Sequence, residues 1–152
     1  MISEPAVPLR ATRLVEHAQL PTRAHPTDAG LDLYAAEAVT IAPAARALVG
    51  TGIALGLAPG TVGLVHPRSG LAARHGVTVL NAPGTVDAGY RGEVKVCLLN
   101  TDTRDSFTVA VGDRIAQLVI QRVELPDLQE VADADALGAT DRSDRGHGST
   151  GR

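Results

Sequence analysis

Apolar side chains recur in short runs along the chain, and the runs are separated by Gly, Pro, Asn and Asp. Short runs with period-two alternation, bounded by turn residues, are typical of β-strands. The pattern predicts strands at residues 9–16, 39–41, 47–57, 61–66, 77–80, 91–99, 107–111 and 114–123. Turn sequences such as Ala58-Pro59-Gly60 and Val111-Gly112-Asp113 recur at spacings suited to a sandwich, barrel or jelly roll. We therefore expect an all-β fold.

One short helix is expected among the strands, at residues 69–75. Ser69 is suited to the N-cap, because its hydroxyl can accept a hydrogen bond from a free N–H of the first turn. Gly76 is suited to the left-handed residue that ends a helix. The helix should therefore be one or two turns long.

Composition indicates one domain with an aliphatic core. The 152 residues include 44% hydrophobic residues, yet the aromatic residues are only Tyr34, Tyr90 and Phe107. A core of Val, Leu, Ile and Ala buries less area per side chain than an aromatic core, which favours further burial between subunits. The single cysteine, Cys97, lies in an alternating run and is interpreted as a small hydrophobic residue. The histidines have no second ligand at zinc spacing, so no zinc site is expected.

The net charge and the lack of targeting signals argue against several classes of protein. A net charge of -3 argues against a protein whose main work is binding nucleic acid or an anionic membrane. No apolar stretch approaches the length of a membrane span, and the first residues lack the pattern of a signal peptide. We expect a cytoplasmic protein that binds neither nucleic acid nor membrane.

The chain changes character near Ala132, after which large apolar residues almost disappear. We expect two parts, a β domain at residues 1–131 and a flexible C-terminal arm at residues 132–152. By composition alone the last stretch is a solvated tail. Its glycines, hydroxyls and arginines also suit a backbone cradle for phosphate that forms on binding.

Five clusters with Gly or Pro beside charged or hydroxyl side chains are predicted to lie in loops between strands. They occupy residues 28–33, 67–72, 81–92, 112–118 and 142–152. Each is a weak signal alone, but together and in this order they resemble the five motifs of the trimeric dUTP pyrophosphatase family. The resemblance covers most of the chain.

The resemblance implies a distorted β jelly roll or barrel, assembled as a homotrimer whose shared active sites hydrolyse dUTP to dUMP and pyrophosphate with Mg²⁺. It implies that Asp87 is the general base for water attack on the α-phosphorus, and that Tyr90 lies under the deoxyribose. Asp32 would support the Mg²⁺ and its water network, and the ion itself would be held mainly by substrate phosphates. The other residues implied in the site are Asn81, Gly84, Thr85, Val86 and Lys95 for uracil, Arg68, Ser69, Gly70 and Gln117 for phosphates, and Arg142, His147, Gly148 and Ser149 in the arm.

The chemistry of these residue types agrees with those roles. Hydrolysis of a triphosphate depends mainly on positioning and charge neutralisation, which Mg²⁺, arginines and hydroxyls provide. An ionised aspartate such as Asp87 can accept a proton from water within hydrogen-bond reach. The amide of Asn81 offers the donor and acceptor that a uracil edge requires. Taken alone, Asp87 and Asn81 would be turn residues, Tyr90 would be a packing residue, and Arg114 would pair with Asp113.

The fifth cluster departs from the family pattern, in which the arginine is followed by glycine, a glycine pair and an aromatic residue. Here Ser143 and Arg145 stand at glycine positions, and His147 stands at the position of the ring that stacks on uracil. Imidazole is a smaller ring, so weaker stacking is expected. A positive φ at Ser143 or Arg145 would be strained.

Two alternatives stay open. The first is a dCTP deaminase, or a bifunctional deaminase and dUTPase, which is similar in fold and phosphate loops. Deamination in that family uses a glutamate in the third motif, whereas this chain has Asp87 followed by Tyr90. The second is a nucleotide-sensing or protein-binding module that keeps the pocket without turnover.

Overall fold

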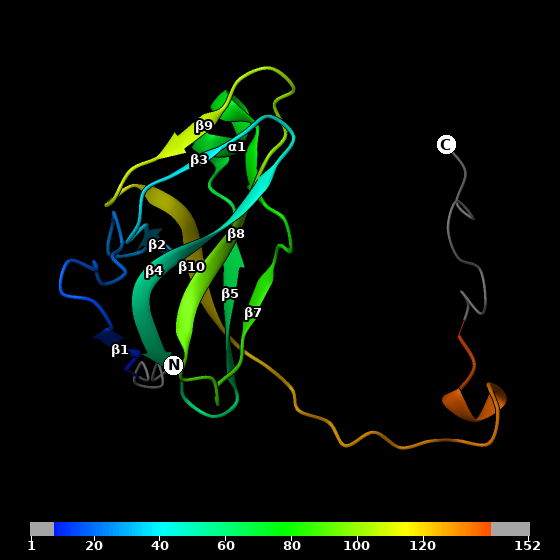
Figure 1. Cartoon of the computed structure of the whole chain (residues 1–152). Helices are drawn as coiled ribbons and strands as arrows, with labels where there is room; N and C mark the ends of the chain where they lie inside the picture. The colour runs from blue at the N-terminus through cyan, green and yellow to red at the C-terminus, as the bar shows by residue number, and fades with distance from the viewer. Residues whose placement is uncertain (1–7, 141–152) are drawn as a thin grey trace.

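A computed structural model describes residues 8–140 and shows two four-stranded antiparallel sheets packed face to face (Figure 1). The first sheet has the order β1-β4-β8-β6, and its strands are β1 (Arg10–Arg13), β4 (Arg46–Gly56), β8 (Glu93–Asn100) and β6 (Val77–Val79). The second has the order β2-β10-β5-β7, and its strands are β2 (Gly30–Tyr34), β10 (Arg114–Arg122), β5 (Thr61–His66) and β7 (Gly84–Val86). A separate pair joins β3 (Val39–Ile41) to β9 (Phe107–Val109). The expected all-β, jelly-roll-like architecture is confirmed.

The core between the sheets is aliphatic, as the composition predicts. In β8, Val94, Val96 and Leu98 point inward and alternate with half-buried or exposed residues. They meet side chains of the second sheet, including Leu33 and Leu118, which have no exposed surface. Because alternate residues of a strand face opposite sides, this alternation directs one face of β8 into the core, whereas β4 is buried on both faces over residues 49–55.

The strand predictions hold at eight places and miss two. Strands β3 and β5 have the predicted bounds, and the other six differ by one to a few residues at their ends. The two missed strands, β2 and β7, lie inside clusters that were predicted to be loops. Both begin with a glycine and are short, and they form strands because neighbouring strands pair with them.

Helix α1 (Ser69–His75) is the one α-helix in the described range, and Gly76 ends it in the left-handed conformation at φ 62°. The prediction that Ser69 is the N-cap is wrong, because Arg68 holds that position and Ser69 is the first helical residue. The Gly76 N–H is bonded to the carbonyl groups of Ala72 and Leu71. The short helix follows β5 directly, which places it at the end of the second sheet (Figure 1).

After β10 the chain leaves the sheets (Figure 1). Residues 123–140 are exposed and contain one 3-10 turn, η1 (Asp135–Leu137). Among residues 8–140, no helix is long and apolar enough to cross a membrane.

Candidate active site

Strand pairing places three polar positions next to one another in the second sheet. Gln117 on β10 is directly opposite Asp32 on β2 and directly opposite His66 on β5. Pro67 and Arg68 follow His66 where β5 ends. The first, second and fourth sequence clusters therefore meet near the end of β5 in the same sheet, although they are far apart in the chain.

Asp32 lies between two arginines near this end of β5. Its Oδ1 is 3.2 Å from Arg68 Nε, and its Oδ2 is 3.3 Å from Arg114 Nη1. The Arg68 guanidinium also donates to the Arg114 carbonyl at 3.3 Å. The Asp32 side chain is only 16% exposed, so these contacts hold its carboxylate largely away from solvent.

The predicted pairing of Arg114 with Asp113 is wrong. Arg114 points to Asp32, while the Asp113 Oδ2 accepts a hydrogen bond from the Ala110 N–H at 2.8 Å. Asp113 thereby closes the turn that leads into β10. Arg114 belongs instead to the charged group around Asp32, a pairing between distant parts of the chain that no local pattern indicates.

Gln117 is held against the second cluster, since its Nε2 donates to the Pro67 carbonyl at 3.1 Å. Its Oε1 lies over Gly30, where a Cβ would collide with it. Gly30 was not among the predicted site residues, although it is part of the first cluster. Because glycine has no Cβ, Gly30 leaves space for the Gln117 amide beside Asp32.

These residues line a pocket of about 420 Å³, which we call the phosphate pocket after the role that the resemblance predicts for Arg68, Ser69, Gly70 and Gln117. Its lining consists of Ala24, Asp28, Ala29, Gly30, Asp32, Arg68, Ser69, Gly70, Arg114 and Gln117. Two guanidinium groups, a hydroxyl and an amide line this space together with the carboxylates of Asp28 and Asp32. The donors suit the oxygen atoms of an anionic ligand, and the carboxylates suit a cation or water bound with it. The predicted phosphate-binding residues Arg68, Ser69, Gly70 and Gln117 and the predicted metal-supporting residue Asp32 are thus brought together.

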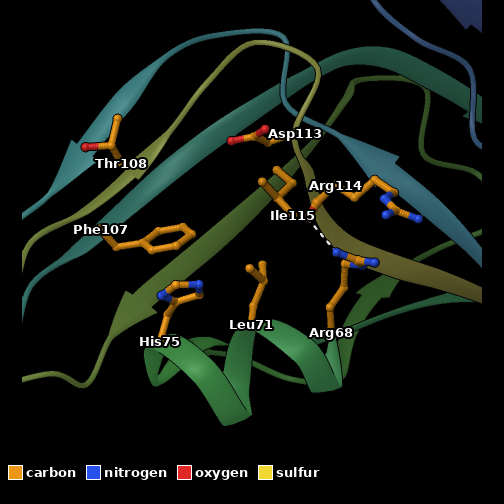
Figure 2. A pocket seen from close by; sticks show the side chains of 8 residues that line it. All are labelled: Arg68, Leu71, His75, Phe107, Thr108, Asp113, Arg114 and Ile115. Carbon is orange, nitrogen blue, oxygen red and sulfur yellow. Dashed lines mark hydrogen bonds between the residues drawn. The ribbon is translucent and has the colours of Figure 1, made fainter.

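A second cavity of about 310 Å³ adjoins the same two arginines (Figure 2). Arg68 and Arg114 line both spaces. Leu71 and Ile115 point into this second cavity, and the rings of His75 and Phe107 stand beside each other at 5.2 Å between centroids. Leu71, Phe107 and Ile115 give this second cavity an apolar part.

The third cluster forms a different group of candidate residues. Gly84 is buried against β5, where a Cβ would lie 3.2 Å from the Cβ of Val65 and 3.7 Å from Asn81 Nδ2. The side chain of Val86 is buried in the core and that of Thr85 is exposed. Val86 can therefore offer a ligand only its backbone, as the resemblance implies for this hairpin.

Asp87 and Tyr90 are the ends of a tight turn, in which the Tyr90 N–H donates to the Asp87 carbonyl at 3.0 Å. The Tyr90 hydroxyl donates to the Glu93 carbonyl at 3.0 Å. Both side chains are exposed. Nearby, Lys95 Nζ lies 3.5 Å from Glu93 Oε2.

The turn that carries Asp87 is separate from the phosphate pocket. Val86 pairs with Gly63 in the first half of β5, whereas Arg68 follows the other end of that strand. Residues 81–92 contribute nothing to the lining of the phosphate pocket. Figure 1 shows the connection from β7 to β8 and helix α1 near opposite ends of the sheets. Within one chain, Asp87 and Asp32 therefore lie in separate places.

Metal ligands are sparse in the part of the chain that the structure describes. Within residues 8–140, no three His, Cys, Asp or Glu side chains come together in a way that could hold a metal ion. The predicted arm residues Arg142, His147, Gly148 and Ser149, with Ser143 and Arg145, lie outside the described residues.

Comparison with known proteins identifies the class. The family model described as dUTPase matches residues 16–151. The deoxyuridine 5'-triphosphate nucleotidohydrolase of Corynebacterium jeikeium is 60% identical over 144 residues, covering 95% of this chain and 93% of its own length. That of Mycolicibacterium gilvum is 57% identical over 145 residues, covering 94% of each chain. The chain belongs to the dUTPase family.

Solved structures agree with this assignment. The dUTPase of Staphylococcus bacteriophage 80alpha, solved with dUPNHPP, superposes with a TM-score of 0.88 at 29% identity and covers 97% of this chain and 100% of its own. A mutant dUTPase from phage phi11 of S. aureus, which coordinates a structural Mg(II) ion, gives a TM-score of 0.79 at 28% identity, with 85% and 99% covered.

Proposed function

We propose that the protein hydrolyses dUTP to dUMP and pyrophosphate at a site completed only between copies of the chain in a homotrimer. The proposal is supported by the distance within one chain between two groups of candidate residues. The phosphate pocket holds Asp32 and Arg68 at one end of the second sheet, whereas Asp87 lies beyond β7 at the other end. A substrate that needs both requires a second subunit.

The phosphate pocket suits the triphosphate of dUTP. Arg68 and Arg114 provide two positive charges, and Ser69 and Gln117 provide neutral hydrogen-bond donors. Positive charge and donors aimed at the phosphate oxygens stabilise the charge that shifts toward the leaving pyrophosphate. The Asp32 carboxylate keeps Arg68 in place before the substrate arrives.

The third cluster suits the nucleoside and the attacking water. The Asn81 amide, the backbone of residues 84–87 and Lys95 face uracil, and the Tyr90 ring lies under the deoxyribose and leaves no room for a 2′-hydroxyl. The Asp87 carboxylate accepts a proton from water as the water oxygen attacks the α-phosphorus. The bond from this phosphorus to the bridging oxygen of pyrophosphate then breaks, giving dUMP and pyrophosphate.

Mg²⁺ fits as a partner of the substrate rather than of a protein cage. The described residues form no cluster of three ligands, and Mg²⁺ usually keeps several waters and binds substrate phosphates with one or two carboxylates. Asp32, whose carboxylate lines the phosphate pocket, would hold a Mg²⁺-bound water. When bound, the ion neutralises phosphate charge.

Exposed apolar side chains support assembly of several copies. Leu48 is 61% exposed on the outer face of the first sheet, and Leu80, which follows β6, is 48% exposed. The segment after β10 adds Leu125 and Leu128, which are 76% and 100% exposed. Burial of such residues between subunits would add to the stability of a chain with few aromatics.

In the trimer, the arm at residues 132–152 closes over the site of a neighbouring subunit. Arg142 meets the terminal phosphate, while His147 stacks on uracil and Gly148 and Ser149 contact phosphate. Deleting residues 141–152 should lower turnover while the unfolding temperature stays unchanged, because this stretch has no large apolar side chain that a core would lose. Loss of folding on deletion would contradict this role. We expect the enzyme to act in the cytoplasm, supplying the precursor of dTTP and keeping uracil out of DNA.

The test of the proposed activity is to mix the purified protein with each deoxynucleoside triphosphate and Mg²⁺, and to measure monophosphate, pyrophosphate and ammonia separately. Selective formation of dUMP and pyrophosphate from dUTP is expected. Ammonia released from dCTP would instead indicate a deaminase. Binding of dUTP without product would indicate a nucleotide sensor.

A further inference from the structure

The turn that carries Asp87 and Tyr90 is braced by the two residues that follow it. One Arg91 nitrogen, Nη1, donates to the Ala88 carbonyl at 2.6 Å and to the Tyr90 carbonyl at 2.8 Å. The arginine side chain thus folds back over its own turn and ties the middle of the turn to its end. Because hydrogen bonds from a charged donor are stronger than neutral ones, this clasp restricts the turn.

Gly92 lies against the hydroxyl end of the Tyr90 side chain, where a Cβ would collide with the hydroxyl oxygen. A Cβ at Gly92 would lie 2.6 Å from Tyr90 Cζ and 3.0 Å from Tyr90 Cε2. No carbon atom can approach a ring that closely, so any side chain at this position must displace the ring. The Tyr90 hydroxyl is anchored to the Glu93 carbonyl on the same side. Gly92 and the Glu93 carbonyl therefore both fix the hydroxyl end of the ring.

We infer that Arg91 and Gly92 are positioning residues that fix the Tyr90 ring. The position of this ring sets the discrimination between deoxyribose and ribose substrates. Arg91 also holds Asp87 at the distance that water attack requires. The inference rests on the proposed function, since it assumes that Tyr90 faces the sugar. Neither residue touches the substrate. Each acts through the conformation of the turn.

The two residues should produce different kinetic effects. A methyl group at Gly92 moves the ring while the clasp stays, so Gly92→Ala should mainly alter the sugar preference. Arg91→Gln loses the charged clasp over Ala88, which is next to Asp87, so it should mainly lower kcat. Arg91→Lys keeps the charge, but its single amine cannot reproduce the planar guanidinium, so it should restore only part of the activity.

The experiment compares the full-length wild type with Gly92→Ala, Gly89→Ala, Arg91→Gln and Arg91→Lys. Gly89 is a matched control from the same turn, because a Cβ there would meet nothing within 4 Å. The measurements are kcat/KM for dUTP and UTP, and the affinities for dUPNHPP and the corresponding ribonucleotide analogue. Unfolding temperatures and circular dichroism report whether each variant is folded.

We expect Gly92→Ala to lower the preference for dUTP over UTP at least about tenfold in both kcat/KM and binding, with Gly89→Ala unchanged. We expect Arg91→Gln to lower kcat at least about tenfold with a smaller change in KM, and Arg91→Lys to lie between it and the wild type. An unchanged preference in Gly92→Ala together with an unchanged kcat in Arg91→Gln would overturn the inference. If the wild type itself hydrolyses no dUTP, the proposed function fails instead. Should Gly92→Ala not fold, Arg91→Gln decides alone.

Discussion

The Oδ1 of Asp32 lies 3.2 Å from the Nε of Arg68, which joins the first and second sequence clusters by an ion pair inside the phosphate pocket. Oδ2 of the same carboxylate faces Arg114. One negative charge therefore holds two positive ones in place. This arrangement preorganises the pocket, because both guanidinium groups are oriented before an anion enters.

Replacing Asp32 by Asn should separate binding from turnover. The variant keeps the shape of the side chain but removes a negative charge from a pocket that receives a polyanion. We expect dUPNHPP to bind as tightly as to the wild type or more tightly, while kcat for dUTP falls at least about tenfold, because Arg68 loses its charged partner. Calorimetric binding and steady-state kinetics measure the two effects. Asp105→Asn, in an exposed loop, is the control, and wild-type turnover in Asp32→Asn would contradict the role given to this ion pair.

Adding a methyl group at Gly30 should disturb Gln117 without unfolding the protein. The methyl would meet Gln117 Oε1, which is the end of a flexible side chain and can move at low cost. We expect kcat/KM for dUTP to fall about tenfold, a loss of about 1.4 kcal/mol, while the unfolding temperature changes little.

A matched control for Gly30→Ala is Gly56→Ala in β4. A Cβ at Gly56 would lie 3.4 Å from the Cβ of Arg10, which is an ordinary contact. Both variants add one methyl group to a strand glycine, so a loss of activity only in Gly30→Ala reports on Gln117. Equal activity in the two variants would show that the position of Gln117 is unimportant.

The acid stability of the protein should depend on Asp102. Hydrogen bonds from the backbone N–H groups of Asp105 and Arg104 hold the pKa of Asp102 below its ordinary value of 3.8, and slight burial opposes them. A lowered folded-state pKa stabilises the fold above the ordinary value, and the stabilisation is lost as the pH falls through the folded-state pKa. Asp102→Ala should therefore lower the unfolding temperature at neutral pH, and the difference from the wild type should shrink in acid.

Thermal unfolding of the wild type, Asp102→Ala and the neighbouring control Thr103→Ala between neutral pH and about pH 2.5 checks this expectation. A difference that stays constant over the whole range would mean that the charge of Asp102 contributes nothing. A difference that grows in acid would reverse the sign of the proposed linkage.

The sequence predicts local features of this protein well. Alternation in residues 93–100 and the turn residues on either side locate β8, and Gly76 locates the end of α1. Strands β2 and β7 were missed because Gly30, Asp32 and Gly84 are typical of loops. Their strand conformation depends on pairing with β10 and β5, and the pattern of a single segment does not report its partners.

In the candidate site too, local features could be predicted from the sequence and contacts between distant residues could not. Its residue types follow from the five clusters and their resemblance to a family, and the structure places Asp32, Arg68 and Gln117 in the lining of one pocket. The pairing of Arg114 with Asp32 joins positions 82 residues apart, and the neighbouring Asp113 was the nearer candidate partner. The role of Gly30 depends on where Gln117 packs. Both relationships are set by tertiary contacts.

The most direct test of a site shared between subunits mixes two impaired variants, Asp87→Asn and Asp32→Asn, and measures dUTP hydrolysis by the reassembled protein. Each variant alone should bind nucleotide and show little turnover, because one has lost the proton acceptor and the other the support of Arg68. If each site takes Asp87 from one subunit and Asp32 from another, about a quarter of the sites in randomly mixed trimers carry both intact residues, and activity should return to about that fraction. Activity no higher than that of the separate variants, in a mixture shown to have exchanged subunits, would contradict a site shared between chains.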